Sequence, residues 1–255
     1  MDELPPVGLG TMGIGDPDLI ETALDVGYRH LDTAQIYRNE NAVGDGIAQA
    51  GLPRDEVFLA TKVWADSLAP DDVHETTAES LDRLNTDYVD LLYVHRPVDT
   101  YHAERTLGAF DELVSEGRTR RVGVSNFTVP ELDEALDVLD APLFAHQTEY
   151  HPLFQRPELL AHAREHDYWL VAYSPLAGGK ADEIEEVTAI ARKHDTSPEA
   201  VCIAWLASEE NVHPIPKASS REHMVANLEA ATLELDPEDV ERIEGIEREE
   251  ELFPE

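Results

Sequence analysis

Short runs of β-branched and other apolar residues alternate along the chain with longer segments in which apolar residues recur at helical spacing. The apolar runs cover residues 7–11, 29–33, 57–63, 89–95, 122–125, 144–148, 169–173 and 212–216. This alternation is typical of βα units around a parallel sheet. Eight units favour a closed barrel over an open sheet. We therefore predict an α/β fold, a (β/α)8 TIM barrel, with one domain over residues 1–255.

The segments between these runs predict helices, several of which begin near Asp, Pro or Thr. They cover residues 17–26, 41–50, 71–84, 103–115, 129–139, 157–165 and 221–231. Residues 182–208 predict two helices where one βα unit needs a single helix, with Ser197-Pro198 marking the break. A last helix is expected over residues 237–249.

Ionisable side chains end three of the predicted strands, at Asp32, Lys62 and His95. The active site of such a barrel lies at the carboxyl ends of its strands, so these side chains are candidates for chemistry. Tyr37 follows Asp32 closely enough to fold back over the same mouth. Spacing alone leaves a structural alternative, in which Asp32 and Lys62 only neutralise each other inside the barrel while Tyr37 and His95 pack.

These four side chains could together reduce a carbonyl group. A hydride acceptor needs a proton donor at its oxygen, and a phenol becomes a usable acid when an ammonium stabilises its phenolate. Lys62 would supply the ammonium to Tyr37, Asp32 would hold Lys62 charged, and His95 would hydrogen-bond the substrate carbonyl. The pattern thus indicates an oxidoreductase that uses Tyr37 as general acid.

The chain resembles the aldo-keto reductase family in a series of stretches that follow the family's order. They are VGLGT at 7–11, YRHLDTA at 28–34, YRNE at 37–40, LATKVW at 59–64, VGVSNF at 122–127, QTEYHP at 147–152, YSPL at 173–176 and IPK at 215–217. The resemblance implies an NAD(P)H-dependent reductase of aldehydes and ketones, with Tyr37, Asp32, Lys62 and His95 as its catalytic tetrad.

The resemblance also assigns cofactor contacts. The nicotinamide carboxamide would be held by Ser125, Asn126 and Gln147, its ring would stack on Tyr173, and Ser174 and Leu176 would lie over the pyrophosphate; Asp32 counts among the cofactor contacts as well. No Gly-x-Gly-x-x-Gly fingerprint follows a predicted strand, which agrees with a family that binds its dinucleotide across a barrel.

Residues 215–227 bear on the choice of dinucleotide. Lys217 matches the family's lysine at the 2′-phosphate of NADPH, whereas Ala218 replaces the serine and His223 the arginine of the usual pattern. The neighbouring Ser220 and Arg221 could assist, and Asn227 matches an adenine contact. We therefore expect NADPH to be preferred, by a smaller margin than usual, with NADH also used.

The chain departs from the family's pattern at both ends. It enters the first strand without the usual short hairpin, and it ends soon after residue 237, which predicts that the long C-terminal loop over the substrate is missing. An open pocket lined by Met12, Trp64 and Arg96 would result, where Arg96 replaces a residue that is often Trp.

Two other function classes remain open from the sequence. One is a non-catalytic cofactor-sensing subunit on the same fold, and the other is an unrelated barrel hydrolase or lyase. His162 and His166 have the spacing of a helical metal pair, but a solvated helix face explains them better, so no metal is expected. The single cysteine, Cys202, is expected to be buried and inert.

The composition is strongly acidic, with 19 Lys and Arg against 54 Asp and Glu and a formal net charge of −35. Such a surface repels nucleic acid and anionic lipid, so we expect neither as a partner. Without an evident signal or membrane segment, we expect a cytoplasmic monomer or weak dimer that acts on a small carbonyl compound. The alternative is an acidic mesophilic enzyme. We favour a halophilic protein, because the Debye length falls to about 3 Å at molar salt and repulsion between surface carboxylates is then screened.

The net charge of −35 predicts a fold that salt stabilises. The melting temperature should rise by about 5 °C or more between about 0.1 M and 3 M KCl, because repulsion between surface carboxylates is screened. Circular dichroism melts across this range test the expectation. A melting temperature that does not depend on salt would contradict it.

Overall fold

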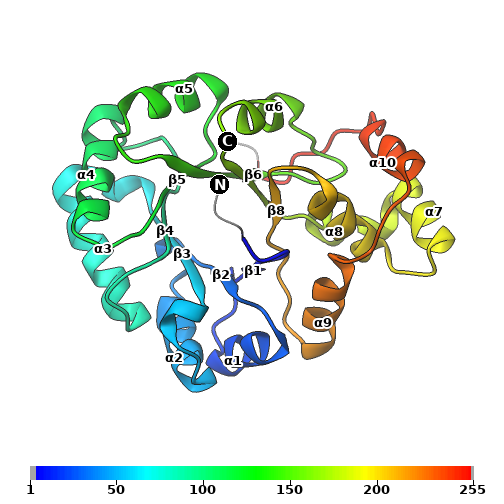
Figure 1. Ribbon diagram of the computed structural model, residues 1–255, viewed down its shortest axis with the longest axis horizontal. Coiled ribbons are helices and arrows are strands. Elements are labelled where there is room, and N and C mark those ends of the chain that lie inside the picture. Colours follow the sequence, from blue (N-terminus) through cyan, green and yellow to red (C-terminus); the bar gives the residue numbers. More distant parts are fainter. Residues whose placement is uncertain (1–3, 254–255) are drawn as a thin grey trace.

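Eight parallel strands form the centre of the molecule, and the helices lie around them (Figure 1). The structure is a computed structural model that describes residues 4–253. The strands are β1 (Leu9–Gly10), β2 (His30–Asp32), β3 (Phe58–Val63), β4 (Leu91–Val94), β5 (Val122–Ser125), β6 (Leu143–Glu149), β7 (Trp169–Tyr173) and β8 (Val212–Pro214). Each strand pairs with the next along the chain, so the predicted (β/α)8 barrel is confirmed.

The first and last strands meet through backbone hydrogen bonds that close the barrel. Gly8 N donates to Pro214 O at 3.1 Å, and Gly10 N donates to Pro216 O at 3.3 Å. A Cβ atom at Gly10 would lie 2.8 Å from the carbonyl oxygen of Ile215. Only glycine permits this approach without a backbone shift.

The helices follow the predicted order, and most of their bounds lie within two residues of the expected ones. They are α1 (Pro17–Val26), α2 (Glu40–Ala50), α3 (Pro70–Leu84), α4 (Ala103–Ser115), α5 (Val129–Val138), α6 (Pro157–Glu165), α7 (Glu185–Lys193), α8 (Pro198–Ser208), α9 (Arg221–Ala230) and α10 (Pro237–Glu244). The break before α8 is confirmed, since Ser197 caps this helix by accepting from Ala200 N.

The expected length of α10 was wrong, because the helix ends at Glu244 and does not reach residue 249. Gly245 follows it, and the chain then turns back toward the barrel, where Glu250 N donates to Leu153 O at 2.7 Å. Hydrogen bonds to a distant part of the chain thus replace those that would have continued the helix.

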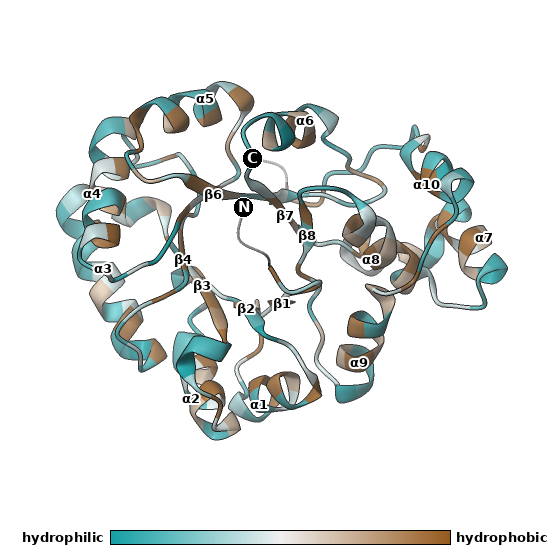
Figure 2. Cartoon of the chain, in the orientation of Figure 1, coloured by the Kyte–Doolittle hydropathy of each residue, from teal (hydrophilic) through white to brown (hydrophobic). Residues whose placement is uncertain are grey.

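Alternate positions on the strands separate two apolar cores. Ala60, Leu91, Tyr93, Ala145, Val171 and Ile215 pack inside the barrel, while Leu59 and Val63 belong to the layer between strands and helices. Apolar helix faces accordingly point at the strands (Figure 2). Lys62 shares the inward face of β3 with Ala60, so its side chain must enter the barrel. In the described part of the chain, no helix is long and apolar enough to cross a membrane.

Candidate active site

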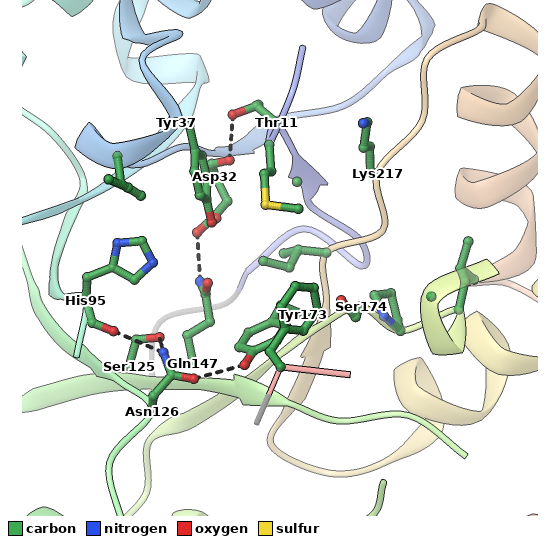
Figure 3. Close-up of a pocket in the computed structure, with 18 of the residues that line it drawn as sticks. Thr11, Asp32, Tyr37, His95, Ser125, Asn126, Gln147, Tyr173, Ser174 and Lys217 are labelled. Carbon is green, nitrogen blue, oxygen red and sulfur yellow. Dashed lines mark hydrogen bonds between the residues drawn. The ribbon is translucent and has the colours of Figure 1, made fainter. Parts of the chain in front are cut away.

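A cavity of about 620 Å³ opens at the carboxyl ends of the strands. Among its lining residues are the predicted site residues Asp32, Tyr37, His95, Ser125, Asn126, Gln147, Tyr173, Ser174, Leu176, Lys217 and His223, together with Met12, Trp64 and Arg96. In Figure 3, His95 and Lys217 lie on opposite sides of this cavity, with Tyr173 between them.

The ammonium of Lys62 is fully buried at the base of this cavity. It donates to Asp32 Oδ1 at 2.5 Å and to Thr33 O at 2.7 Å. Burial lowers the pKa of Lys62, but the negative charge of Asp32 and the contact with Tyr37 raise it more, so the net pKa lies above its ordinary value. Lys62 therefore stays charged at neutral pH.

Tyr37 lies beside this ammonium, whose Nζ is 5.2 Å from the centre of the phenol ring. A 3₁₀ turn over Gln35–Tyr37 carries the residue, and it is held because Gln35 Oε1 accepts from Trp64 N at 3.0 Å. Burial raises the pKa of Tyr37, Lys62 offsets part of this rise, and the net pKa lies above its ordinary value. We expected the ammonium to make the phenol more acidic overall. Desolvation outweighs it here, so the phenol keeps its proton near neutrality.

His95 completes the group of four, with its ring edge-to-face against Tyr37 at 5.9 Å and against Trp64 at 5.0 Å between centroids. Burial, together with the positive charges of Lys62 and Arg96, lowers the pKa of His95 to about 2. The imidazole is therefore neutral, and it can donate one hydrogen bond into the cavity. The predicted convergence of Asp32, Tyr37, Lys62 and His95 is thus what the geometry displays.

A set of polar side chains forms the wall next to this group. Gln147 Nε2 donates to the second oxygen of Asp32 at 2.8 Å. Asn126, whose backbone has φ of 62°, donates to His95 O and to Ser125 Oγ and accepts from the Tyr173 hydroxyl at 3.0 Å. These bonds orient the ring of Tyr173 toward the cavity. The hydroxyl proton of Ser125 and the amide oxygen of Gln147 remain able to bind a ligand.

The expected phosphate-binding residues are only partly gathered in the cavity. Lys217 and His223 line its far side together with Ser219. Ser220 caps α9 by accepting from His223 N, Arg221 is exposed at the start of that helix, and the buried Asn227 contacts Tyr28. Ser220, Arg221 and Asn227 do not line this cavity.

The C-terminal segment reaches the cavity even though it is short. Glu149 accepts from Leu252 N at 2.7 Å and from Phe253 N at 3.1 Å, and the Phe253 ring lies edge-to-face against Tyr173. Met12 is 48% exposed at the rim of the cavity. Phe253 supplies a wall of this cavity that was not predicted, because its pairing with Glu149 spans more than one hundred residues.

Two groups of side chains elsewhere have the composition of metal sites. His162 and His166 lie near Asp133, but both ring nitrogens of His162 already have partners, in Asp133 Oδ1 at 3.1 Å and the Tyr168 hydroxyl at 2.7 Å. In the second group, which contains His194, Asp236 and Asp239, the ammonium of Lys193 bridges the two carboxylates. The absence of a metal stays a prediction.

Comparisons with known proteins agree on one family. The sequence model of the Aldo/keto reductase family matches residues 6–248. The chain is 41% identical over 249 residues to "Methylglyoxal reductase DkgB" of Escherichia coli O157:H7, covering 95% of this chain and 93% of the relative. It is 34% identical to "Glyoxal reductase" of Bacillus subtilis (strain 168), covering 99% and 92%. A crystal structure of an aldo-keto reductase from a Medee basin deep-sea metagenome library has a TM-score of 0.93 at 33% identity, covering 100% of this chain and 95% of that one.

The low pKa of His95 should be visible in the NMR signals of its imidazole nitrogens. Its imidazole should show no titration between about pH 5 and pH 9, because protonation would place a second buried cation beside Lys62. Two-dimensional NMR of imidazole nitrogens tests this, with His95→Gln identifying the resonance. An inflection near neutral pH in that resonance would contradict the assignment of a neutral donor.

Proposed function

Because the chain belongs to the aldo/keto reductase family, we propose that Tyr37, Lys62, Asp32 and His95 carry its chemistry. The chain is an NAD(P)H-dependent oxidoreductase that reduces carbonyl compounds to alcohols. The observation that carries the assignment of these four residues is their convergence around one buried ammonium at the mouth of the barrel. A sensing subunit would not need this cluster, and the comparisons lend no support to that alternative.

The cavity fits a nicotinamide dinucleotide. A primary carboxamide offers one acceptor and two donors. The Ser125 hydroxyl proton, the Gln147 amide oxygen and the second lone pair of Asn126 Oδ1 complement them. The ring of Tyr173 offers an aromatic face for the nicotinamide, and Ser174 and Leu176 border the way toward Lys217. When bound, this dinucleotide supplies the hydride.

The side chains of this protein would position the substrate carbonyl and transfer a proton to its oxygen. His95 donates a hydrogen bond to the substrate carbonyl and sets its position near Tyr37. Tyr37 gives its proton to the oxygen that gains negative charge, and Lys62 stabilises the phenolate that results. Asp32 holds Lys62 charged and oriented, and its second oxygen fixes Gln147. Solvent then returns a proton to Tyr37 through the open mouth of the cavity.

We propose small oxoaldehydes as the preferred substrates. The similar proteins from Escherichia coli O157:H7 and Bacillus subtilis are named methylglyoxal and glyoxal reductases. An open cavity of about 620 Å³ admits such molecules next to a dinucleotide. A screen of glyoxal, methylglyoxal and longer aldehydes, followed by NAD(P)H absorbance, tests the assignment.

We also propose that the enzyme works in the cytoplasm, at high salt, as a monomer or weak dimer. The net charge of −35 supports a halophilic protein, and a dinucleotide that must be regenerated supports a cytoplasmic location. A monomer or weak dimer suffices, since every proposed catalytic group comes from one chain. Nucleic acid and membrane are not proposed as partners.

Replacing Tyr37 by Phe should remove the proton donor while it keeps the ring. Turnover should fall at least about 100-fold, as is typical when a general acid is lost. Quenching of protein fluorescence by NADPH should persist, which shows that the fold and cofactor binding are intact. Turnover near that of the wild type would exclude Tyr37 as the acid.

The cofactor preference depends on Lys217, which is exposed at the far side of the cavity. We propose that it binds the 2′-phosphate, with His223 or Arg221 assisting, so that kcat/KM is higher with NADPH than with NADH. Lys217→Met should lower kcat/KM with NADPH by about 10-fold or more and change it much less with NADH, because only NADPH loses a charge-assisted hydrogen bond. Equal losses with both cofactors, or a wild-type preference for NADH, would refute this role.

A further inference from the structure

A second, smaller cavity of about 290 Å³ adjoins the catalytic one on the side of His95. Arg96, Asn126, Tyr173 and Phe253 line both cavities, so they form a shared wall. Because Arg96 follows His95 directly and also lines the catalytic cavity, a substrate whose carbonyl is held by His95 can present its other end to Arg96. The side pocket also contains Thr128, Thr148 and two carboxylates, and it is lined mainly by polar surface.

Arg96 is the cation at this junction, and it has no ion pair or hydrogen bond to any other residue in the described range 4–253. Other partly buried arginines are paired with a carboxylate, for example Arg54 with Asp90 at 2.9 Å and Arg83 with Glu40 at 2.8 Å. An unpaired, half-buried guanidinium is notable in a chain with 54 acidic and 19 basic residues. Its charge reaches the catalytic groups, since it helps to lower the pKa of His95.

The other charged groups of the side pocket are largely committed. Glu149 accepts from His151 Nε2 and from two backbone N–H groups of the C-terminal segment. Arg156 donates to Glu158 at 2.8 Å. Glu251 is the exception, because it is exposed and has no ion pair in the part of the chain that the structure describes. Because Glu251 is exposed and Arg96 is half-buried, Arg96 decides which ligand charge is favoured deeper in the side pocket.

We propose that Arg96 and the side pocket form an anion subsite, which makes this reductase select carbonyl compounds that also carry a carboxylate. The inference rests on the proposed function, because the same His95 and Tyr37 must hold the carbonyl. A guanidinium binds a carboxylate through two parallel hydrogen bonds, which fixes the orientation of the substrate as well as its affinity. The carboxylate would take the place of the protein carboxylate that Arg96 lacks.

The test compares two aldehydes of the same length, succinic semialdehyde with its carboxylate and butanal with a methyl group in that place. The quantity measured is the ratio of their kcat/KM values, at one fixed molar KCl concentration. The wild type should favour succinic semialdehyde by about 10-fold or more, and Arg96→Gln should lower the ratio by a similar factor, mainly through KM. Arg96→Lys should recover part of it, because a point charge replaces the planar fork.

Two further variants separate a local effect from a general one. Glu251→Gln should raise the ratio, because it removes a negative charge from the lining of the side pocket. Arg192→Gln, on the outer helix α7, removes the same charge as Arg96→Gln far from both cavities and should leave the ratio unchanged. A wild-type ratio near one that Arg96→Gln does not alter would overturn the anion subsite, while turnover of butanal would still support the proposed function. Failure to reduce either aldehyde would overturn both.

Discussion

The buried ion pair between Lys62 and Asp32 is the interaction on which the site depends. The register of β2 and β3 places Asp32 beside Ala60, and Lys62 lies two residues further along the same inward face. An ammonium in this position is tolerated only with a partner, since removing one member of a buried pair typically destabilises a protein by about 3–5 kcal/mol. The pair then organises its surroundings: one oxygen of Asp32 holds Lys62, and the other holds Gln147. The proposed catalytic side of the cavity and its proposed cofactor-binding side are thus linked through a single carboxylate.

The environment of Tyr37 reflects a balance between desolvation and charge. Burial favours the neutral phenol, and Lys62 favours the phenolate, with burial the larger effect in the free protein. The phenol is therefore protonated before a substrate arrives, which is the state that a proton donor needs. In the proposed mechanism, transfer of the proton to the substrate oxygen leaves a phenolate next to an ammonium already in place, and no group has to move to stabilise it. His95 can stay neutral throughout, because a second cation beside Lys62 is unfavourable.

Much of the barrel could be predicted because strand alternation and helix caps are local signals. The eight strands, the break before α8 and the inward direction of Lys62 all follow from short stretches of sequence. The same holds for the approach of Asp32 and Lys62, since adjacent parallel strands end at the same rim. The proposed roles of Ser125, Asn126 and Gln147 needed the family resemblance, because spacing does not assign a ligand. The end of α10 and the place of Phe253 were not predicted, since they depend on hydrogen bonds from residues 250–253 to Leu153 and Glu149, which no local pattern encodes.

The distribution of charge gives the protein two electrostatic regimes. Its surface as a whole repels anions, whereas the cavity presents Arg96 and Lys217 without a carboxylate partner among the described residues, and its own acidic group, Asp32, is neutralised by Lys62. The acidic surface repels an anionic ligand while the ligand is still several ångströms away. This repulsion is screened when the Debye length falls to about 3 Å at molar salt. A direct hydrogen bond between a guanidinium or ammonium and an oxyanion acts at contact distance and is screened far less. Salt should therefore speed the association of anionic ligands while it leaves most of the bound-state contact energy in place. An acidic exterior and a dinucleotide that carries phosphates are compatible in this protein for that reason.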